Sequence, residues 1–404
     1  MRSFFVSKRI VLAMLVVVAA LSANRLRAEP PEPETRRVEH REGPIPEPAA
    51  PVDREQLDAA IKRGVDFLLR DQNENGSWGS ATRTKGLNIY APVPGAHHAF
   101  RDATTSLCVS ALIESQDDRR EVREAIDRGE AFLLENLPSL RRATGDAIYN
   151  VWGHAFSLQA LARLHALRAG DSERQKQIVA AAQQQVDLLG RYASVDGGWG
   201  YYDFRYQTKQ PSSSSISFTS ATGIIALFEA REIGVEVPQS LLDKAVAAIQ
   251  RQRKPDNSYA YGEYLKMRPM LGINRPGGSL GRSQACNLAL RRAGDDTISE
   301  DVLRVWLNRL FARNGWLSIG RKRPIPHESH FQVAGYFYYY GHFYAALCID
   351  ELPESDRPPF RDLMAQTLLP LQEKDGSWWD YPLYAYHQPY GTSFAVMSLV
   401  RCRP

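Results

Sequence analysis

Seven of the nine histidines of this chain fall in loops between expected helices or at helix starts, and imidazole can bind metals or transfer protons near neutral pH. Three possible metal ligands, His327, Glu328 and His330, fall within four residues. No spacing here is typical of a known metal site, so scattered loop histidines are the simpler interpretation. We therefore expect neither a bound metal nor another cofactor.

Other side chains near these histidines could act as acids, bases or ligand contacts. Asp102, at the expected start of an apolar helix, would favour the protonated carboxyl if buried; an N-cap role is the alternative interpretation. The candidate catalytic residues are Asp102, His154, Tyr340 and His342. The candidate ligand-binding residues are Tyr201, Tyr202, Arg282, Tyr339, His387 and Tyr390. Aromatic rings of this kind suit a lipophilic ligand or a sugar, while packing at the rim of the fold is the alternative.

A repeated pattern determines how these residues are positioned. From Asp53 onward, an amphipathic helix is followed by a Gln, a Gly-x-Trp turn, a variable loop and a second helix rich in small apolar residues. The clearest copy ends at Trp78, the last at Trp378, and weaker copies end at Trp199, Tyr259 and Trp316. The turns recur about every sixty residues with one degenerate copy, which predicts six units over residues 53–404.

The two helices of each unit differ in polarity. The first helices alternate apolar and charged side chains, as in Leu57 and Ile61 beside Asp58 and Lys62. The second helices are apolar nearly all round, and such helices are buried. We therefore expect an all-α fold, an α/α toroid of six helical hairpins with the second helices inside. An open superhelix is disfavoured because the last unit carries no polar cap.

The pattern resembles a known family. The stretch from Arg63 to Trp78 is similar to the QW repeat of squalene–hopene and oxidosqualene cyclases, and residues 376–399 (GSWWDYPLYAYHQPYGTSFAVMSL) resemble the final repeat of cyclase-like proteins. The resemblance covers most of residues 55–402 and implies the toroid of terpenoid cyclases and protein prenyltransferases. Such cyclases use an Asp-x-Asp-Asp acid, which is missing here, and no Asp-x-Cys zinc pair of a prenyltransferase occurs in the expected repeat. The resemblance thus implies a fold without either activity.

The N-terminal residues are typical of a signal peptide. Basic side chains at Arg2, Lys8 and Arg9 precede an apolar run over residues 10–21 that is too short to span a bilayer comfortably. We expect a signal peptide over residues 1–28, a Pro/Glu-rich disordered linker over 29–52 and export to the periplasm or the exterior, with no transmembrane span after cleavage. An uncleaved anchor is the alternative.

The net charge excludes one class of partner. Residues 1–28 hold five basic and no acidic side chains, so the remainder carries 45 Lys and Arg against 46 Asp and Glu. Nucleic-acid-binding proteins usually carry an excess of basic side chains, and residues 29–404 have none.

Three functions fit the expected toroid. The first is the holding of a lipophilic, isoprenoid-like molecule in a central cavity, with catalysis left open. The second is a non-catalytic scaffold or binding protein of the cell envelope. The third is a glycan-active enzyme similar to toroidal polysaccharide lyases, for which Asn150, His154, Tyr340 and His342 would be the first candidates. The fold alone does not choose among them.

Overall fold

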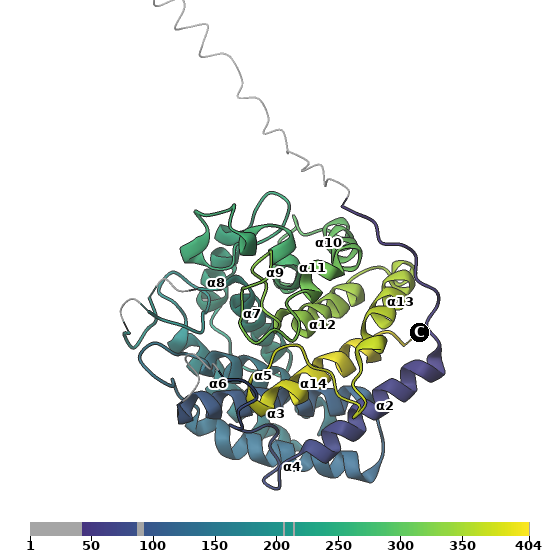
Figure 1. The fold of residues 1–404 in the computed structure, drawn as a ribbon. Coiled ribbons are helices and arrows are strands. Elements are labelled where there is room, and N and C mark those ends of the chain that lie inside the picture. Colours follow the sequence, from purple (N-terminus) through teal and green to yellow (C-terminus); the bar gives the residue numbers. More distant parts are fainter. Residues whose placement is uncertain (1–42, 87–92, 205–206, 213–214, 404) are drawn as a thin grey trace, which may run out of the picture. The chain divides into compact units, whose positions relative to one another are not determined.

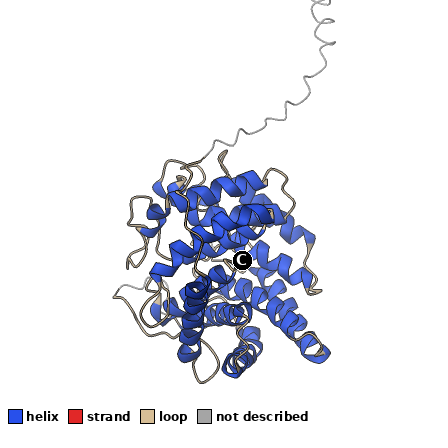
Figure 2. Cartoon of the chain, turned by 90° about the vertical axis from the view of Figure 1, so that its right-hand side faces the viewer, coloured by secondary structure: helices blue, strands red, loops and turns tan. Residues whose placement is uncertain are grey.

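A computed structural model describes residues 43–86, 93–204, 207–212 and 215–403 of the chain. Within these ranges the regular elements are helices, and no β-strand forms (Figure 2). The six hairpins, outer helix first, are α2 (Arg54–Asp71) with α3 (Pro94–Ser115), α4 (Arg120–Asn136) with α5 (Asn150–Leu167), α6 (Ser172–Tyr192) with α7 (Ser217–Glu232), α8 (Gln239–Gln252) with α9 (Leu280–Arg292), α10 (Glu300–Ala312) with α12 (Phe337–Asp350), and α13 (Arg357–Leu368) with α14 (His387–Val400).

Shorter helices lie in the loops. They are α11 (Asn314–Ser318) and 3-10 helices at Leu137–Ser139, Glu263–Leu265, Gly272–Asn274, Gly277–Ser279, Glu354–Asp356, Leu369–Leu371 and Tyr384–Tyr386.

The inner helices form a closed ring. Each packs against the inner helix of the next hairpin, in the order α3, α5, α7, α9, α12 and α14, and α14 packs back against α3 (Figure 1). The first outer helix, α2, also contacts α14. The chain therefore folds as the predicted α/α toroid of six hairpins.

Side-chain polarity explains which helix lies inside. In α2 the apolar stripe of Leu57, Ile61 and Val65 is buried while Lys62 is exposed, as expected for a helix with one face toward the core. In α12 every residue from Phe337 to Ile349 is buried. Small residues allow the inner backbones to touch: a Cβ on Gly341 would lie 2.6 Å from the Cα of Gly281 in α9.

Three buried tryptophans stabilise the turns that follow the outer helices within their hairpins. The indole Nε1 of Trp78 donates to the Leu68 carbonyl at 2.7 Å, and its backbone N–H donates to the Thr105 hydroxyl at 3.0 Å. Trp199 and Trp378 make the equivalent pair of contacts. Each tryptophan thus ties the last turn of an outer helix to the inner helix of the same hairpin.

The same turns join neighbouring hairpins. The Gln72 amide donates to the Ala125 carbonyl of α4 at 2.9 Å, and the Gln372 amide donates to the Ala60 carbonyl of α2 at 2.9 Å. Gly376 has φ +91°, and a Cβ there would lie 2.5 Å from the Arg63 carbonyl oxygen. A side chain is excluded by both conformation and space. The turn of the last hairpin therefore contacts α2 in the same way that the turn of the first hairpin contacts α4, and this contact closes the ring.

Ion pairs link the C-terminal ends of all six inner helices. Going round the ring, Arg401 pairs with Glu114, Glu114 with Arg163 at 2.7 Å, Arg163 with Glu229 at 2.9 Å, Glu229 with Arg292 at 3.7 Å, and Arg292 with Glu351 at 3.3 Å. Asp350, beside Glu351 at the end of α12, pairs with Arg401 at 3.1 Å and completes the circuit. We call these residues the charge ring. Its signs alternate from one inner helix to the next.

The segment before α2 contacts the toroid. The Val52 N–H donates to the Asp362 carboxylate at 2.9 Å, and the Gln366 amide donates to the Ala50 carbonyl at 3.1 Å. The predicted signal peptide and residues 29–42 of the predicted linker lie outside the described residues. In the described part, no helix is long and apolar enough to cross a membrane.

Candidate functional site

A cavity of about 730 Å³ lies among the inner helices and the loops that lead into them. Most of its lining side chains are aromatic: Phe100, Tyr149, Trp152, Phe156, Tyr201, Tyr202, Phe204, Phe218, Tyr261, Tyr264, Tyr336, Tyr340, Tyr381, Tyr390 and Phe394. The other lining side chains are mainly apolar, and no described lining residue is Asp or Glu. The loops run from outer to inner helices, so the lining gathers at the end of the ring opposite the charge ring.

Tyrosine hydroxyls meet within this lining. The Tyr149 and Tyr202 hydroxyls lie 2.9 Å apart, and the Tyr201 hydroxyl bonds that of Tyr261. Burial raises the pKa of Tyr201 and of Tyr261, so both phenols stay protonated. They can donate to, or accept from, a polar atom of a bound molecule.

His327 adds a proton acceptor to the tyrosine group. Its Nδ1 lies 2.6 Å from the Gln332 carbonyl oxygen, which can only accept, so Nδ1 carries the proton. Burial lowers the pKa of His327, and the neutral ring then presents Nε2 as an acceptor 3.3 Å from the Tyr336 hydroxyl. The cavity wall can therefore orient a hydroxyl or carbonyl oxygen.

Among the described lining residues, one is a lysine, Lys85. The Lys85 ammonium bonds the Tyr381 hydroxyl, lies 4.0 Å from that ring's centre and donates to the Pro324 carbonyl at 2.8 Å. Partial burial lowers the pKa of Lys85 to about 8. Lys85 therefore remains mainly charged at neutral pH, as a cation held over an aromatic ring.

Four of the candidate catalytic and ligand-binding residues line this cavity: Tyr201, Tyr202, Tyr340 and Tyr390. The Tyr340 hydroxyl donates to the Phe218 carbonyl at 3.0 Å and lies 2.9 Å from the Thr222 hydroxyl. The Tyr390 hydroxyl donates to Asp380 at 2.6 Å. Both rings face the cavity while their hydroxyls are satisfied by the protein.

Asp102 lies elsewhere. The helix α3 begins at Pro94, so Asp102 is well inside it and the N-cap interpretation is wrong; a proline at the first helical position starts the helix earlier than the apolar pattern indicated. The Asp102 carboxyl is fully buried, which raises its pKa, and it is absent from the described cavity lining. His98 Nε2 lies 3.2 Å from it, as a close ion pair rather than an aligned hydrogen bond.

His154 and His342 face other protein groups. His154 Nδ1 bonds the Gln185 amide oxygen of α6 at 2.7 Å, and its Nε2 lies 3.2 Å from the Asn150 amide nitrogen. His342 Nδ1 bonds the Tyr338 carbonyl at 2.7 Å, and its Nε2 meets the Asn314 amide at 2.8 Å. Burial lowers the pKa of each to about 4. Both rings are neutral, and neither lines the cavity.

Three candidate ligand residues also lie outside the lining. The Arg282 guanidinium, 1% exposed, donates to the Tyr259 carbonyl at 2.9 Å and to the Gly278 carbonyl at 2.8 Å, and burial lowers its pKa to about 10. The Tyr339 N–H donates to Asp380 at 3.0 Å. His387 Nδ1 bonds the Tyr384 carbonyl at 2.6 Å. Each of these groups is bonded to another part of the protein, outside the described cavity lining.

The possible metal ligands diverge. His327 lines the cavity, while Glu328 and His330 are exposed. Among the described residues, no group of three or more His, Cys, Asp or Glu side chains has the geometry to hold a metal ion.

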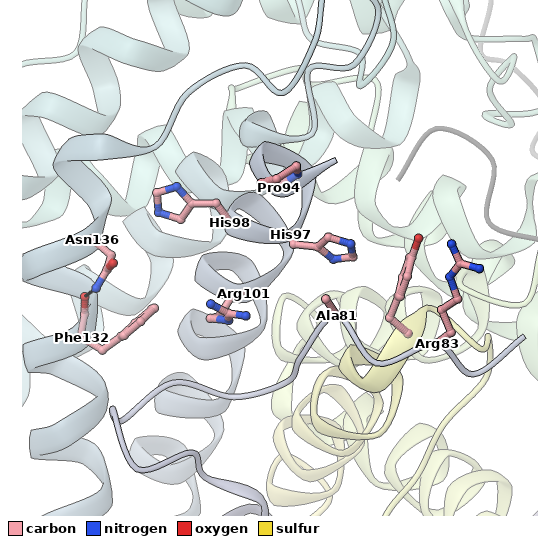
Figure 3. A pocket seen from close by; sticks show the side chains of 9 residues that line it. Ala81, Arg83, Pro94, His97, His98, Arg101, Phe132 and Asn136 are labelled. Carbon is pink, nitrogen blue, oxygen red and sulfur yellow. Dashed lines mark hydrogen bonds between the residues drawn. The ribbon is translucent and has the colours of Figure 1, made fainter. Parts of the chain in front are cut away.

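A second pocket, of about 630 Å³, lies beside the N-terminal end of α3. His97, His98 and Arg101 come from α3, Ala81 and Arg83 from the loop on one side of it, and Phe132 and Asn136 from α4 on the other (Figure 3). The remaining lining residues are Pro94 and Tyr384. None of the nine described lining residues is acidic.

The sequence did not single out several residues that the structure brings to these sites. They are Phe218 of α7, Tyr261, Lys85 and the buried acid Asp380. The repeat could have indicated Tyr261. It lies two residues after Tyr259, the aromatic residue of its turn, just as Tyr201 lies two residues after Trp199. No comparable signal marks Lys85, which lies in a variable loop.

Comparison with known proteins identifies the family. The squalene-hopene cyclase C-terminal domain matches residues 48–265, more than half of the chain. The chain therefore belongs to this family, as the sequence resemblance predicted.

Solved structures share the architecture at low sequence identity. The unsaturated glucuronyl hydrolase from Streptococcus agalactiae is 14% identical, with a TM-score of 0.54 over 87% of this chain and 93% of that one. D-mannose isomerase is 13% identical, with a TM-score of 0.53 over 86% and 97%. The type II terpene cyclase MstE from Scytonema is 16% identical, with a TM-score of 0.49 over 86% and 98%. At such identities the likeness to the first two shows a common fold alone.

Proposed function

We propose that this chain is an exported toroid that holds a lipophilic, isoprenoid-like molecule in its central cavity. The observation that carries the proposal is the aromatic lining of a cavity of about 730 Å³. This volume lies within the usual range for small-molecule sites, which are mostly apolar with a few polar groups that fix orientation.

The polar groups of the lining suggest how such a molecule would be oriented. Its hydrocarbon body would pack against Phe156, Phe218 and Phe394 on the inner helices. A hydroxyl or carbonyl oxygen at one end would meet the tyrosine hydroxyls of the loops, Tyr202 among them. Transfer of the apolar surface from water to these rings would supply most of the affinity.

Holding fits the lining better than protonation-initiated cyclisation does. Alkene protonation needs a strong acid in the cavity, and the described lining offers phenols and one ammonium instead. The buried Asp102 carboxyl lies beside the second pocket. We therefore expect squalene incubated with the protein to be recovered unchanged. Its conversion to a cyclic product, lost in Asp102→Asn, would show that Asp102 is the acid.

Blocking the cavity tests the proposal. Protein purified without detergent should release lipid on organic extraction, measured by mass spectrometry, and geranylgeraniol should raise its melting temperature. Ala103 lines the cavity, so Ala103→Trp places an indole within it and should abolish both effects. Ala59 is exposed on α2, and Ala59→Trp, the matched control, should retain both.

Two results would refute the proposal. One is an empty extract with no thermal shift from geranylgeraniol; an anionic polysaccharide that stabilises the protein would then favour glycan chemistry. The other is equal lipid content in Ala103→Trp and Ala59→Trp. Export is tested separately, by N-terminal sequencing of the native protein, which should begin between Ala23 and Glu29.

A further inference from the structure

We propose that the second pocket, beside the N-terminal end of α3, binds a phosphate or sulfate group carried by a small molecule. This inference does not depend on the ligand of the central cavity. It rests on the charge, placement and partners of the side chains that line the pocket.

The lining of this pocket is basic, and one buried carboxyl, Asp102, lies next to it. Residues 75–101 contain Arg83, Lys85, His97, His98 and Arg101 and no acidic residue. The salt bridges in the described part of the chain include neither Arg83 nor Arg101. About half of the other arginines in the described residues pair with carboxylates, as in the charge ring. Two guanidinium groups at one pocket therefore keep their charge available for an external anion.

The basic side chains line the pocket from different sides. His97 points from α3 toward Arg83, while His98 points from the same helix toward Asn136, and Arg101 lies between them one turn further along (Figure 3). The Arg101 Nε is buried and has no hydrogen-bond partner among the described residues. The pocket is thus walled by donors on more than one side.

This arrangement suits a tetrahedral anion. A carboxylate has two oxygens in one plane, and a single guanidinium fork satisfies both. A phosphate or sulfate ester has three free oxygens that point in different directions, and it can accept from Arg83, Arg101 and an imidazole together. The volume of about 630 Å³ exceeds that of the anion itself, so it leaves room for the molecule that carries it.

The carboxyl of Asp102 contacts His98 and influences its charge. It is fully buried and lies 3.2 Å from His98 Nε2. The contact with Asp102 raises the pKa of His98, so it favours the cationic form of the imidazole. In contrast, burial and the neighbouring Arg101 lower the pKa of His97. His98 is therefore the imidazole expected to carry charge, with His97 a neutral donor or acceptor.

Titration of the full chain tests the site directly. Inorganic phosphate and inorganic sulfate are the probes, measured by calorimetry at constant ionic strength, with acetate as the planar anion. We expect phosphate or sulfate to bind at least tenfold more tightly than acetate. Whichever of the two binds more tightly identifies the ligand as a phosphorylated or a sulfated molecule.

Variants locate the binding. Arg83 is exposed in a loop, so Arg83→Met should fold normally, and it should weaken binding about tenfold through loss of a charge-assisted hydrogen bond. His98→Gln and Arg101→Met should each weaken it similarly. Arg120→Met removes an arginine 75% exposed at the far end of α4 and should leave binding unchanged.

The proposal is overturned if acetate binds as tightly as phosphate and sulfate. It is also overturned if Arg83→Met and His98→Gln bind the better anion as the parent does. The lipid content of Arg83→Met should equal that of the parent, so failure here leaves the proposal for the central cavity standing.

Discussion

Asp380 is a buried acid that supports the cavity wall. Its two carboxylate oxygens accept from the Tyr390 hydroxyl at 2.6 Å and from the Tyr339 N–H at 3.0 Å, so it joins the loop before α14 to the first turn of α12. Burial raises the pKa of Asp380 to about 7 despite these hydrogen bonds. The proton is therefore bound more tightly in the folded protein than in the unfolded chain.

Asp380 should make stability depend on pH. Between its ordinary pKa of 3.8 and about 7, the folded protein keeps a proton that the unfolded chain has lost. The free energy of unfolding therefore falls as pH rises through this window, by roughly 3–4 kcal/mol at most. Asp380→Asn cannot lose the proton, so its stability relative to the parent should improve between pH 5 and pH 8, measured by urea unfolding.

Asp375→Asn provides the control. The pKa of Asp375 is lowered below 3.8, with Ser377 and Gln388 bonded to the carboxylate, so this group stays ionised in both states between pH 5 and pH 8. The effect of Asp375→Asn should therefore be the same at the two pH values. A constant difference between Asp380→Asn and the parent would show that Asp380 is already ionised in the folded protein.

Individual side chains were hard to place from the sequence for a physical reason. Inner helices such as α5 and α12 are apolar on every side, so no polar face indicates which residues point to the axis and which to the outer helices. Tyr340 and His342 stand two residues apart in α12; the first lines the cavity, and the second bonds Asn314 outside it.

At the scale of elements, the turns that contain Trp78 and Trp378 should contribute strongly to the stability of the fold. Trp78 and Trp378 are fully buried, and each indole N–H bonds the end of its outer helix. Trp78→Ala and Trp378→Ala should each lower the free energy of unfolding by about 3–5 kcal/mol. Trp316 is 39% exposed, and Trp316→Ala should cost clearly less. Thermal unfolding of the three variants compares them, and equal melting temperatures would contradict this role.

The turns show how far a repeat pattern predicts structure. Tyr259 replaces the tryptophan of its turn with the same backbone contact, since its N–H donates to the Ser279 hydroxyl at 3.1 Å. The sequence pattern also predicts a copy of the turn at Trp316, but Trp316 lies in the short helix α11 and packs against Phe331. The period located the hairpins correctly in both cases, because it reflects the length of each unit rather than the identity of one ring.

At the scale of the whole molecule, the charge ring should make the toroid behave as one cooperative unit. Arg163 is 15% exposed and pairs with both Glu114 and Glu229, which belong to the hairpins on either side. Arg163→Met leaves each of these partly buried carboxylates with one partner fewer. We expect it to lower the free energy of unfolding by about 3–5 kcal/mol, as is usual for breaking a buried pair.

Lys62→Met is the matched control, because Lys62 forms an exposed pair with Asp66 on α2. Such pairs contribute about 1 kcal/mol or less. Chemical unfolding measures both variants. Equal effects of Arg163→Met and Lys62→Met would mean that water screens the charge ring.

The residues of the charge ring recur once in each repeat of the sequence, but the apolar pattern of the helices makes this recurrence hard to notice. The second helices end in Glu114, Arg163, Glu229, Arg292, Glu351 and Arg401, one charge for each repeat at a similar register. Each charge alone resembles an ordinary polar helix end. Their relation emerges only when the six units are arranged in a circle, because Arg401 and Glu114 are neighbours in space and far apart along the chain.

Because the charges alternate in sign around a closed ring, the number of repeats must be even. With six inner helices, each basic end lies between two acidic ends. A circle of five or seven would bring two ends of like sign together in a partly buried place, where their repulsion is weakly screened. Gain or loss of a single hairpin would therefore meet an electrostatic penalty that gain or loss of an adjacent pair avoids. The count of repeats is thus constrained by charge as well as by the geometry of the barrel.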